Sequence, residues 1–236
     1  MKLSIIIPVY NEERTIAEIL KRVKNLKLPS NLEKEIVVID DASSDSTPEI
    51  LDQQLNSSLK KIKHLNNLGK GAAVRTGLQR ATGEIIITQD ADLEYNPKDY
   101  QKLLAPILER KSQVVFGTRL KNYPLKFWGE NKTVLPLHLI ANKLLTTLTN
   151  ILYGSNLTDM ETGYKAFTKN VMKNIKLQSN KFDIEPEITI KIIKAGYQIL
   201  EVPIITNPRD YSEGKKIGFW DGLQAIWTVI KYKFTN

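Results

Sequence analysis

Acidic side chains follow two short apolar runs of the sequence, and this placement can support metal chemistry. The run Ile85-Ile86-Ile87 leads into Asp90-Ala91-Asp92, and residues 35–39 lead into Asp40. Two aspartates separated by one small residue can place their carboxylates on a divalent cation and its ligand. Hard oxygen donors suit Mg²⁺ or Mn²⁺, which keep coordination positions for phosphate oxygens. The pattern predicts a metal-bound phosphate site, with a solvated turn as the alternative.

The elements that must position these carboxylates alternate between strands and helices. Apolar β-branched runs predict strands at 3–9, 35–39, 60–65, 84–88 and 112–117, and helical spacing predicts a helix after each of the first four. Asn11 is expected to cap the first helix. The alternation predicts a mostly parallel α/β sheet with helices on both faces. Ligands bind outside the carboxyl ends of such strands, where Asp40, Asp90 and Asp92 follow.

Beyond Arg119 the pattern becomes mainly helical. Residues 124–152 and the region after Phe219 show helical spacing of apolar residues, and a further helix is expected at 184–195. Strands are expected near 164–168 and 197–206. With no repeat or linker between these elements, the economical interpretation is one domain with a helical appendage.

Composition excludes several function classes. The chain has no cysteine and two histidines, which excludes zinc-thiolate, iron–sulfur and histidine-rich metal sites. Its formal charge of +8 implies attraction to phosphates. Nucleic acid is not the expected partner, because basic stripes with interleaved aromatics are missing and the acidic sheet edge would repel a phosphate backbone. No apolar stretch is long enough to span a membrane.

The segment 66–77 (NNLGKGAAVRTG) resembles a phosphate-binding loop but departs from it. It lacks the Gly-Lys-Ser/Thr ending of the nucleotide-binding P-loop and the third glycine of the dinucleotide fingerprint. Its small residues can equally let a helix pack close to the sheet. Lys70 and Arg75 are candidate phosphate neighbours.

Several segments together resemble the family-two glycosyltransferases of GT-A fold, and within them the dolichol-phosphate mannosyltransferases and polyprenyl-phosphate glycosyltransferases. The resemblance covers nearly the whole chain. It is carried by residues 4–13 (SIIIPVYNEE), 38–47 (VIDDASSDST), 67–71 (NLGKG), 90–92 (DAD), 158–167 (TDMETGYKAF), 182–188 (FDIEPEI), 201–204 (EVPI) and 209–217 (RDYSEGKKI).

The resemblance implies metal-dependent, inverting transfer of a hexose from a nucleotide sugar, GDP-mannose or UDP-glucose, to a polyprenyl or dolichyl phosphate. It implies one GT-A domain over 1–236 with a C-terminal helical appendage. Residues 1–119 would form the half that binds the nucleotide sugar. Residues 120–236 would form the acceptor-binding half with its amphipathic helices.

The resemblance also implies roles for individual residues. Asp90 and Asp92, flanking Ala91, would hold Mg²⁺ or Mn²⁺ at the donor diphosphate, and Glu94 stands where relatives often have a glutamine ligand, which leaves the metal open. The residues expected to hold the nucleoside are Pro8, Tyr10, Glu12 and Asp40. Those expected to contact the donor or acceptor phosphate are Arg119, Arg209, Lys215 and Lys216.

Acceptor chemistry decides whether a general base is needed. A phosphate monoester is largely ionised near neutral pH and can attack without one, whereas a sugar hydroxyl cannot. Asp159 stands where other family-two enzymes place their base, and it can act as that base or orient a neighbour. Glu161, Glu185 and Glu187 are expected to be structural.

The terminal helix carries aromatic and basic residues that suit a lipid interface, although a helix docked on its own domain shows the same periodicity. The expected location is cytoplasmic, peripheral at the cytoplasmic face of the membrane. A glycosyltransferase with a sugar or polysaccharide hydroxyl acceptor is the alternative function. A nucleotidyltransferase is less consistent, since no glycine follows the first strand in residues 10–13. The residues give no indication of a partner protein.

Overall fold

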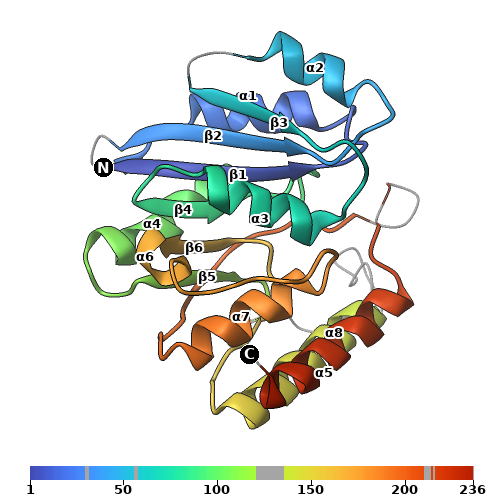
Figure 1. Cartoon of the computed structure of the whole chain (residues 1–236). Coiled ribbons are helices and arrows are strands. Elements are labelled where there is room, and N and C mark those ends of the chain that lie inside the picture. Colours follow the sequence, from blue (N-terminus) through green and yellow to red (C-terminus); the bar gives the residue numbers. More distant parts are fainter. Residues whose placement is uncertain (30–31, 56–57, 121–135, 210–213, 215, 236) are drawn as a thin grey trace, which may run out of the picture.

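The predicted sheet forms the centre of the protein, shown here in a computed structural model that describes residues 1–236 except 30–31, 56–57, 121–135, 210–213, 215 and 236. Within these residues the sheet has seven strands in the order β3-β2-β1-β4-β6-β5-β7 (Figure 1). The strands are β1 (Lys2–Val9), β2 (Glu33–Asp40), β3 (Leu59–Lys63), β4 (Ile85–Thr88), β5 (Val114–Thr118), β6 (Lys165–Thr168) and β7 (Leu200–Pro203).

One strand runs against its neighbours, and this orientation shapes the site. β6 pairs antiparallel with both β4 and β5, whereas β1 pairs parallel with β2 and β4, and β5 with β7. An antiparallel strand begins at the edge where its parallel neighbours end. The segment that precedes β6, residues 158–164, therefore lies at the carboxyl edge of β4 and β5.

Helices cover both faces of the sheet because its strands are apolar on both sides (Figure 1). Leu3, Ile5 and Ile7 of β1 pack in one buried cluster with α1, whereas Ile6 packs in another with α3. The first face carries α1 (Ile16–Asn25), α2 (Thr47–Gln53), the 3₁₀ turn η2 (Pro97–Asp99) and α4 (Tyr100–Leu108). The second carries α3 (Lys70–Arg80), α6 (Lys169–Met172) and α7 (Ile184–Lys194).

Two long helices pair beside this sheet. α5 (Pro136–Tyr153) and α8 (Phe219–Phe234) lie side by side next to α7 (Figure 1). A third buried cluster joins them, with Leu145 from α5, Ile190 from α7 and Val229 from α8. The hydroxyl of Tyr153 also donates to the carbonyl of Val229 at 2.7 Å. Both helices thus bury one face against the domain and leave another exposed.

The predicted fold class is confirmed: a mixed α/β sheet, mostly parallel, with helices on both faces and a helical appendage. The predicted cap of the first helix is wrong. Thr15, not Asn11, precedes α1, because Asn11 adopts a left-handed conformation (φ 50°) and binds Ser43 and Ser44 instead. Of the helix expected over 124–152, residues 124–135 lie outside the described ranges.

Glu35 ties three strands together and gives a testable stability effect. Its carboxylate accepts from Lys60 Nζ at 2.7 Å, from the Thr82 backbone N–H at 2.8 Å and from the Ser4 hydroxyl. Burial works against ionisation, yet Lys60, Ser4 and Thr82 outweigh it and lower the pKa of Glu35 to about 2.

Glu35→Gln is expected to lower the free energy of unfolding at pH 7 by about 2 kcal/mol. Because the folded pKa is depressed, this contribution is complete above the unfolded pKa and is lost as pH falls toward about 2. Urea unfolding at pH 7 and pH 3 should show the gap between variant and native protein closing at the lower pH. Glu18→Gln, at an exposed helix pair with Arg22, is the control and should change little. A constant gap at both pH values would contradict the assignment.

Candidate active site

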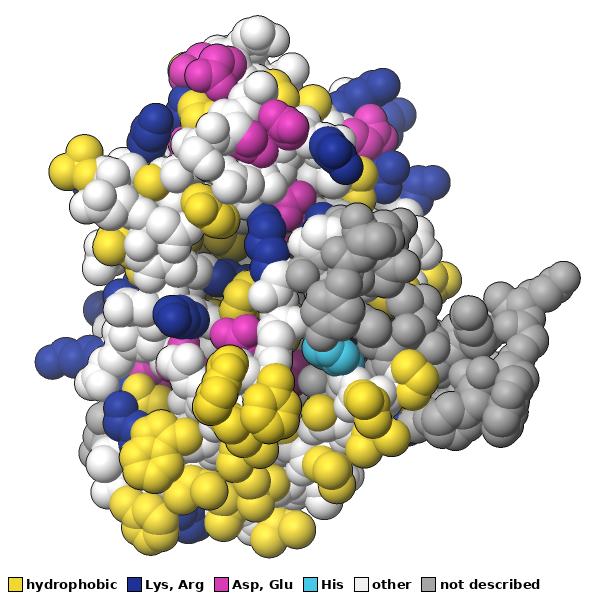
Figure 2. Space-filling view, turned by 90° about the vertical axis from the view of Figure 1, so that its right-hand side faces the viewer, with side chains coloured by type: hydrophobic (Ala, Val, Ile, Leu, Met, Phe, Trp, Pro, Cys, Tyr) yellow, Lys and Arg dark blue, Asp and Glu magenta, His cyan; other side chains and the backbone are white. Residues whose placement is uncertain are grey.

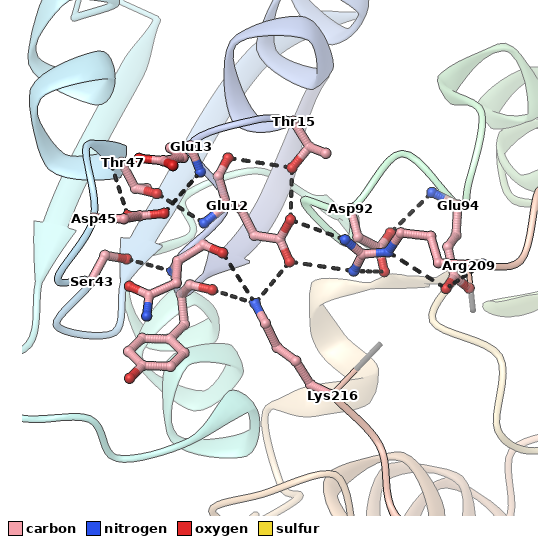
Figure 3. Close-up of polar contacts among 12 residues, drawn as sticks. Glu12, Glu13, Thr15, Ser43, Asp45, Thr47, Asp92, Glu94, Arg209 and Lys216 are labelled. Atoms are coloured by element: carbon pink, nitrogen blue, oxygen red, sulfur yellow. Dashed lines mark hydrogen bonds and ion pairs between the residues drawn. The ribbon is translucent and has the colours of Figure 1, made fainter. Parts of the chain in front are cut away.

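Sharp turns follow the strands whose carboxyl ends carry the predicted site. Asn11 after β1, Ala42 after β2 and Leu93 after β4 all have positive φ, at 50°, 61° and 62°. Non-glycine residues rarely adopt this conformation, and it is concentrated at functional sites. The turns bring Glu12 from the first loop and Asp92 from the third to one region of the sheet edge (Figure 3).

An arginine from the C-terminal segment lies among these acidic side chains (Figure 3). Nη1 and Nη2 of Arg209 each lie 3.3 Å from a carboxylate oxygen of Glu12, and Nη2 lies 3.2 Å from Asp92 Oδ2. The backbone N–H of Arg209 donates to Glu94 Oε1 at 3.1 Å, and its Nε lies 3.8 Å from the same oxygen. Three carboxylates from two loops therefore share one guanidinium.

Lys216 adds a second cation to Glu12. Its Nζ lies 2.8 Å from Glu12 Oε1, donates to the carbonyl of Tyr10, and stands 5.6 Å from the centre of the Tyr10 ring. Lys215, the neighbouring predicted phosphate ligand, lies outside the described residues. Arg209 and Lys216 thus contact side chains from the loops after β1 and β4.

The pKa values of Glu12 and Asp92 are shifted in opposite directions. Burial raises the pKa of Glu12, but Lys216 and Arg209 outweigh it and hold that pKa below its usual value. Burial, with the neighbouring carboxylates of Asp90 and Glu94, raises the pKa of Asp92 to about 7 even though Arg209 opposes the shift. The folded protein therefore disfavours the ionised form of Asp92, whereas it favours that of Glu12.

This donor set fits a divalent metal in its chemistry, though not as a ready-made cluster. In the described ranges, no three Asp, Glu or His side chains are gathered around one metal position. Arg209 contacts Asp92 and Glu94, which the sequence analysis expects as metal ligands. Carboxylate oxygens are the ligands that Mg²⁺ and Mn²⁺ prefer, and a cation bound here would favour the ionised form of Asp92. A cation at these two carboxylates would compete with the guanidinium of Arg209.

A buried chain of alternating charges holds Asp90. Lys70 Nζ, at the start of α3, lies 2.8 Å from Asp90 Oδ1 and 3.0 Å from Glu185 Oε1. Glu185 pairs through its other oxygen with Lys165, which is fully buried at the start of β6. Burial alone would lower the pKa of Lys70, but Asp90 and Glu185 raise it well above its usual value. The ion pair with Lys70 therefore holds one oxygen of Asp90 in place.

A close backbone approach fixes the other oxygen of Asp90. A Cβ at Gly163 would overlap Asp90 Oδ2, so only glycine fits at this position. The backbone N–H of Gly163 donates to the hydroxyl of Tyr95 at 2.8 Å. The segment before β6 thereby packs directly against the first aspartate of the predicted metal pair.

Asp159 is fully buried and bound to Arg119. Its Oδ2 accepts from the backbone N–H and Nε of Arg119 at 2.9 and 2.7 Å, and its Oδ1 accepts from Nη2 at 2.8 Å. The backbone N–H of Asp159 in turn donates to Glu201 at 3.0 Å. Both carboxylate oxygens are engaged, and this arrangement orients Arg119 at the end of β5.

Asp40 and Asp41, both at the end of β2, differ in their surroundings. Asp40 is fully buried; its Oδ1 accepts from the backbone N–H of Ser43, and Oδ2 has no partner in the described part of the chain. Asp41 binds the His64 ring at 2.6 Å and the backbone N–H groups of residues 68 and 69. Asp41 thus organises the loop that leads into Lys70.

A cavity of about 1060 Å³ collects most of the predicted residues. Asp40 and Asp159 do not line it. In Figure 2, acidic and basic side chains lie around the middle of this face, and hydrophobic side chains gather below them over α5 and α8. The predicted site residues on the cavity wall are Pro8, Tyr10, Glu12, Asp90, Ala91, Asp92, Glu94, Arg119, Arg209 and Lys216.

Two of the three glutamates expected to be structural lie on the cavity wall. Glu161 and Glu185 line the cavity, whereas Glu187, fully buried on α7, does not. Lys70 lines it through its pair with Asp90, whereas the Nη atoms of Arg75 bind Ser179 and Asn180. The sequence signal for Glu161 is its place between Asp159, which binds Arg119, and Gly163, which packs against Asp90.

Comparison with known proteins agrees with this architecture and identifies the enzyme class. The sequence profile described as "Glycosyl transferase family 2" matches residues 4–176. The chain therefore belongs to glycosyl transferase family 2, and the protein is a glycosyltransferase.

Relatives and solved structures support the assignment. The chain is 29% identical to the UDP-N-acetylglucosamine–dolichyl-phosphate N-acetylglucosaminyltransferase of Methanococcus voltae, covering 97% of this chain and 95% of that protein. It is 30% identical to the dolichol-phosphate mannosyltransferase of Pyrococcus furiosus, covering 99% of this chain and 65% of that protein. Glucosyl-3-phosphoglycerate synthase from Mycobacterium tuberculosis, in complex with Mn²⁺, UDP and phosphoglyceric acid, shares the fold. The superposition has a TM-score of 0.71 at 20% sequence identity, and it covers 100% of this chain and 79% of that chain.

Proposed function

We propose that this glycosyltransferase transfers a hexose from a nucleotide sugar to a polyprenyl phosphate at a membrane surface, using Mg²⁺ or Mn²⁺. The names of the two relatives with dolichyl-phosphate acceptors support the acceptor class. The neighbour solved with Mn²⁺ and UDP supports a metal-bound nucleotide.

The acceptor proposal rests on the change from charged to apolar side chains along the cavity wall. One end carries the carboxylates and cations of the strand ends, and the other carries apolar side chains of α5 and α8. A phosphate with a long hydrocarbon chain needs both kinds of wall side by side, whereas a small polar acceptor needs only the first. The apolar residues are Leu137, Leu144, Leu145 and Leu148 on α5, and Phe219, Leu223 and Ile226 on α8.

The donor would bind at the charged end. Asp90, Asp92 and Glu94 would hold the metal, which neutralises charge on the leaving nucleotide. The nucleoside would be held by Pro8, Tyr10 and Glu12, with Asp40 behind them. Arg119, Arg209, Lys215 and Lys216 would then bring the donor and acceptor phosphates together. In this arrangement residues 1–119 would supply most of the donor site, and residues 120–236 would supply the acceptor site and further contacts to the donor.

The state of Asp159 supports a phosphate acceptor. A general base needs a free oxygen within reach of the proton it removes. Both oxygens of Asp159 are bound by Arg119, and the side chain is fully buried. An ionised phosphate needs no base, so Asp159 would act as a positioning residue for Arg119.

The acceptor is tested with purified protein, Mn²⁺ and labelled UDP-glucose or GDP-mannose. Transfer is expected to a short polyprenyl phosphate and not to the matching polyprenol, because only the phosphate is already ionised. Preferential transfer to the alcohol, to a free sugar or to 3-phosphoglycerate would contradict the proposal.

Membrane contact is proposed from the exposed face of α8. Trp220, Trp227 and Phe234 are 79%, 64% and 83% exposed, and aromatic residues on an amphipathic helix favour the lipid interface. None of the helices within the described ranges is long and apolar enough to cross a membrane.

Trp227 does not line the cavity, so Trp227→Glu separates docking from catalysis. In the same assay, this variant is expected to lose transfer to polyprenyl phosphate in vesicles and to keep transfer to a short acceptor in solution. Equal loss with both acceptors would argue against a membrane contact at this helix.

A further inference from the structure

Glu161 carries a buried oxygen at the wall of the cavity that has no partner in the described part of the chain. Its side chain lines the same cavity as Asp90, Asp92 and Arg119. Oε1 accepts no hydrogen bond from any described residue. A buried carboxylate oxygen without a partner costs folding free energy, so its position calls for a physical reason.

The cations near Glu161 are committed to other groups. Lys165 Nζ donates to the carbonyls of Met160 and Thr162 at 3.2 and 2.5 Å, and to Glu185. An ammonium has three protons, so Lys165 has none left for Glu161. Nε and Nη2 of Arg119 both donate to Asp159, and no N–H of Arg119 donates to Glu161 Oε1.

The electrostatic environment agrees with this geometry. Burial raises the pKa of Glu161 to about 7, and the neighbouring charges of Glu185 and Asp159 act in the same direction against Lys165 and Arg119. Glu187 is the contrasting case on the same side of the sheet. Its carboxylate accepts from the backbone N–H groups of Gln178 and Ser179 at 2.8 and 2.7 Å and from the Tyr232 hydroxyl at 2.7 Å. The described residues therefore supply donors to the structural carboxylate of Glu187 and none to Glu161 Oε1.

The backbone places Glu161 beside the expected end of the donor diphosphate. Gly163, two residues further along, packs against Asp90 Oδ2. A diphosphate bound through a metal at Asp90 and Asp92 would carry its sugar on the terminal phosphate. A carboxylate on the adjoining wall is then within the region that the sugar ring enters, and sugar hydroxyls are good donors to carboxylate oxygens.

We infer that Glu161 accepts a hydrogen bond from a hydroxyl of the transferred hexose and thereby helps the enzyme to recognise the sugar of its donor. The inference rests on the proposed function for the donor, and it adds a sugar-recognition residue that the motif analysis had assigned to structure. The bound hydroxyl supplies the partner that no described residue provides to Oε1.

The test compares each nucleotide sugar with its own diphosphate. Calorimetry with Mn²⁺ measures the affinities of UDP, UDP-glucose, GDP and GDP-mannose for native protein, Glu161→Gln and Glu161→Ala. The comparison uses whichever nucleotide sugar and matching diphosphate the native protein binds. For these, Glu161→Ala is expected to weaken the affinity for the nucleotide sugar about 10- to 100-fold and the affinity for the diphosphate less than about twofold. Glu161→Gln, whose amide oxygen still accepts, should recover part of that loss.

Thermal unfolding without ligand gives an independent readout. Both Glu161 variants should unfold at the same temperature as native protein or a higher one, because they remove an unsatisfied buried group. The control is Glu187→Gln, which removes a satisfied buried carboxylate away from the cavity. It should lower the unfolding temperature and leave the ratio of sugar to diphosphate affinity unchanged.

The outcomes separate the inference from the proposed function. Native protein that binds none of the four nucleotides would overturn the proposed function. A different result would overturn only the sugar contact. In it, native protein binds a nucleotide, but the Glu161 variants lose affinity for nucleotide sugar and diphosphate equally or unfold at a clearly lower temperature. Full donor affinity with lost transfer in Glu161→Gln would indicate a proton-transfer role instead, and this would also overturn it.

Discussion

Asp92→Asn is expected to reduce hexose transfer about 1,000-fold and to remove the dependence of nucleotide binding on Mn²⁺. Asp92 is one of the carboxylates expected to hold the metal at the donor diphosphate. An asparagine of the same shape supplies a neutral oxygen and cannot offset the charge of a divalent cation. Calorimetry with UDP and GDP, with and without Mn²⁺, together with the transfer assay, measures both effects.

The same variant should not destabilise the free protein at pH 8. Burial and the charges of Asp90 and Glu94 raise the pKa of Asp92 to about 7, so its ionised form is disfavoured in the folded state. That cost is absent below the unfolded pKa, grows as pH rises toward 7 and is constant above it. The unfolding temperature of Asp92→Asn relative to native protein should therefore rise between pH 5 and pH 8.

Asp45→Asn is the matched control for this prediction. Asp45 accepts from the backbone N–H groups of Thr47 and Glu13 at 3.0 and 3.1 Å, and these bonds lower its pKa against the opposing effect of burial. Loss of the Asp45 carboxylate should lower the unfolding temperature and leave hexose transfer unchanged, which is the opposite of the result expected for Asp92→Asn. Unchanged metal-dependent nucleotide binding in Asp92→Asn would contradict the metal site.

The strand and helix pattern was predictable because the hydrophobic periodicity is strong. β1 alternates its apolar residues between two buried clusters, and α1 buries Ile16, Ile19, Leu20 and Val23 on one face. The insertion of β6 between β4 and β5 depends on contacts between residues far apart in sequence, and local periodicity carries no information about it. This insertion nevertheless brings Asp159, Glu161 and Gly163 to the site.

In the candidate site, too, local motifs were predictable from the sequence and contacts between separate loops were not. Motifs identified the carboxylates of residues 90–94 because their spacing after a strand has a local meaning. The pairing of Asp159 with Arg119 and of Lys70 with Asp90 joins separate loops, so it required the fold. The unpartnered oxygen of Glu161 likewise depends on the acceptors that Lys165 has already engaged and on the orientation of Arg119 toward Asp159, and only three-dimensional geometry reveals this.

Arg209→Ala is expected to separate metal binding from transfer. In the free protein the guanidinium of Arg209 contacts Glu12, Asp92 and Glu94, and we expect a cation to compete with it for the latter two. Removing it should tighten Mn²⁺ binding about tenfold in the absence of nucleotide, because a competing charge is lost. Transfer to polyprenyl phosphate should fall about 100-fold, because the displaced guanidinium is the group that would hold the two phosphates together.

Two further variants define the origin of this effect. Arg209→Lys keeps the positive charge and loses the forked geometry, so Mn²⁺ affinity should stay near the native value while transfer remains impaired. Arg75→Ala removes an arginine that binds Ser179 and Asn180 and does not line the cavity, so both quantities should be preserved. Mn²⁺ affinity that is unchanged or weaker in Arg209→Ala would show that the arginine does not compete with the metal. Arg209 would then hold the acidic loops in place for the metal, and its loss should weaken donor binding together with transfer.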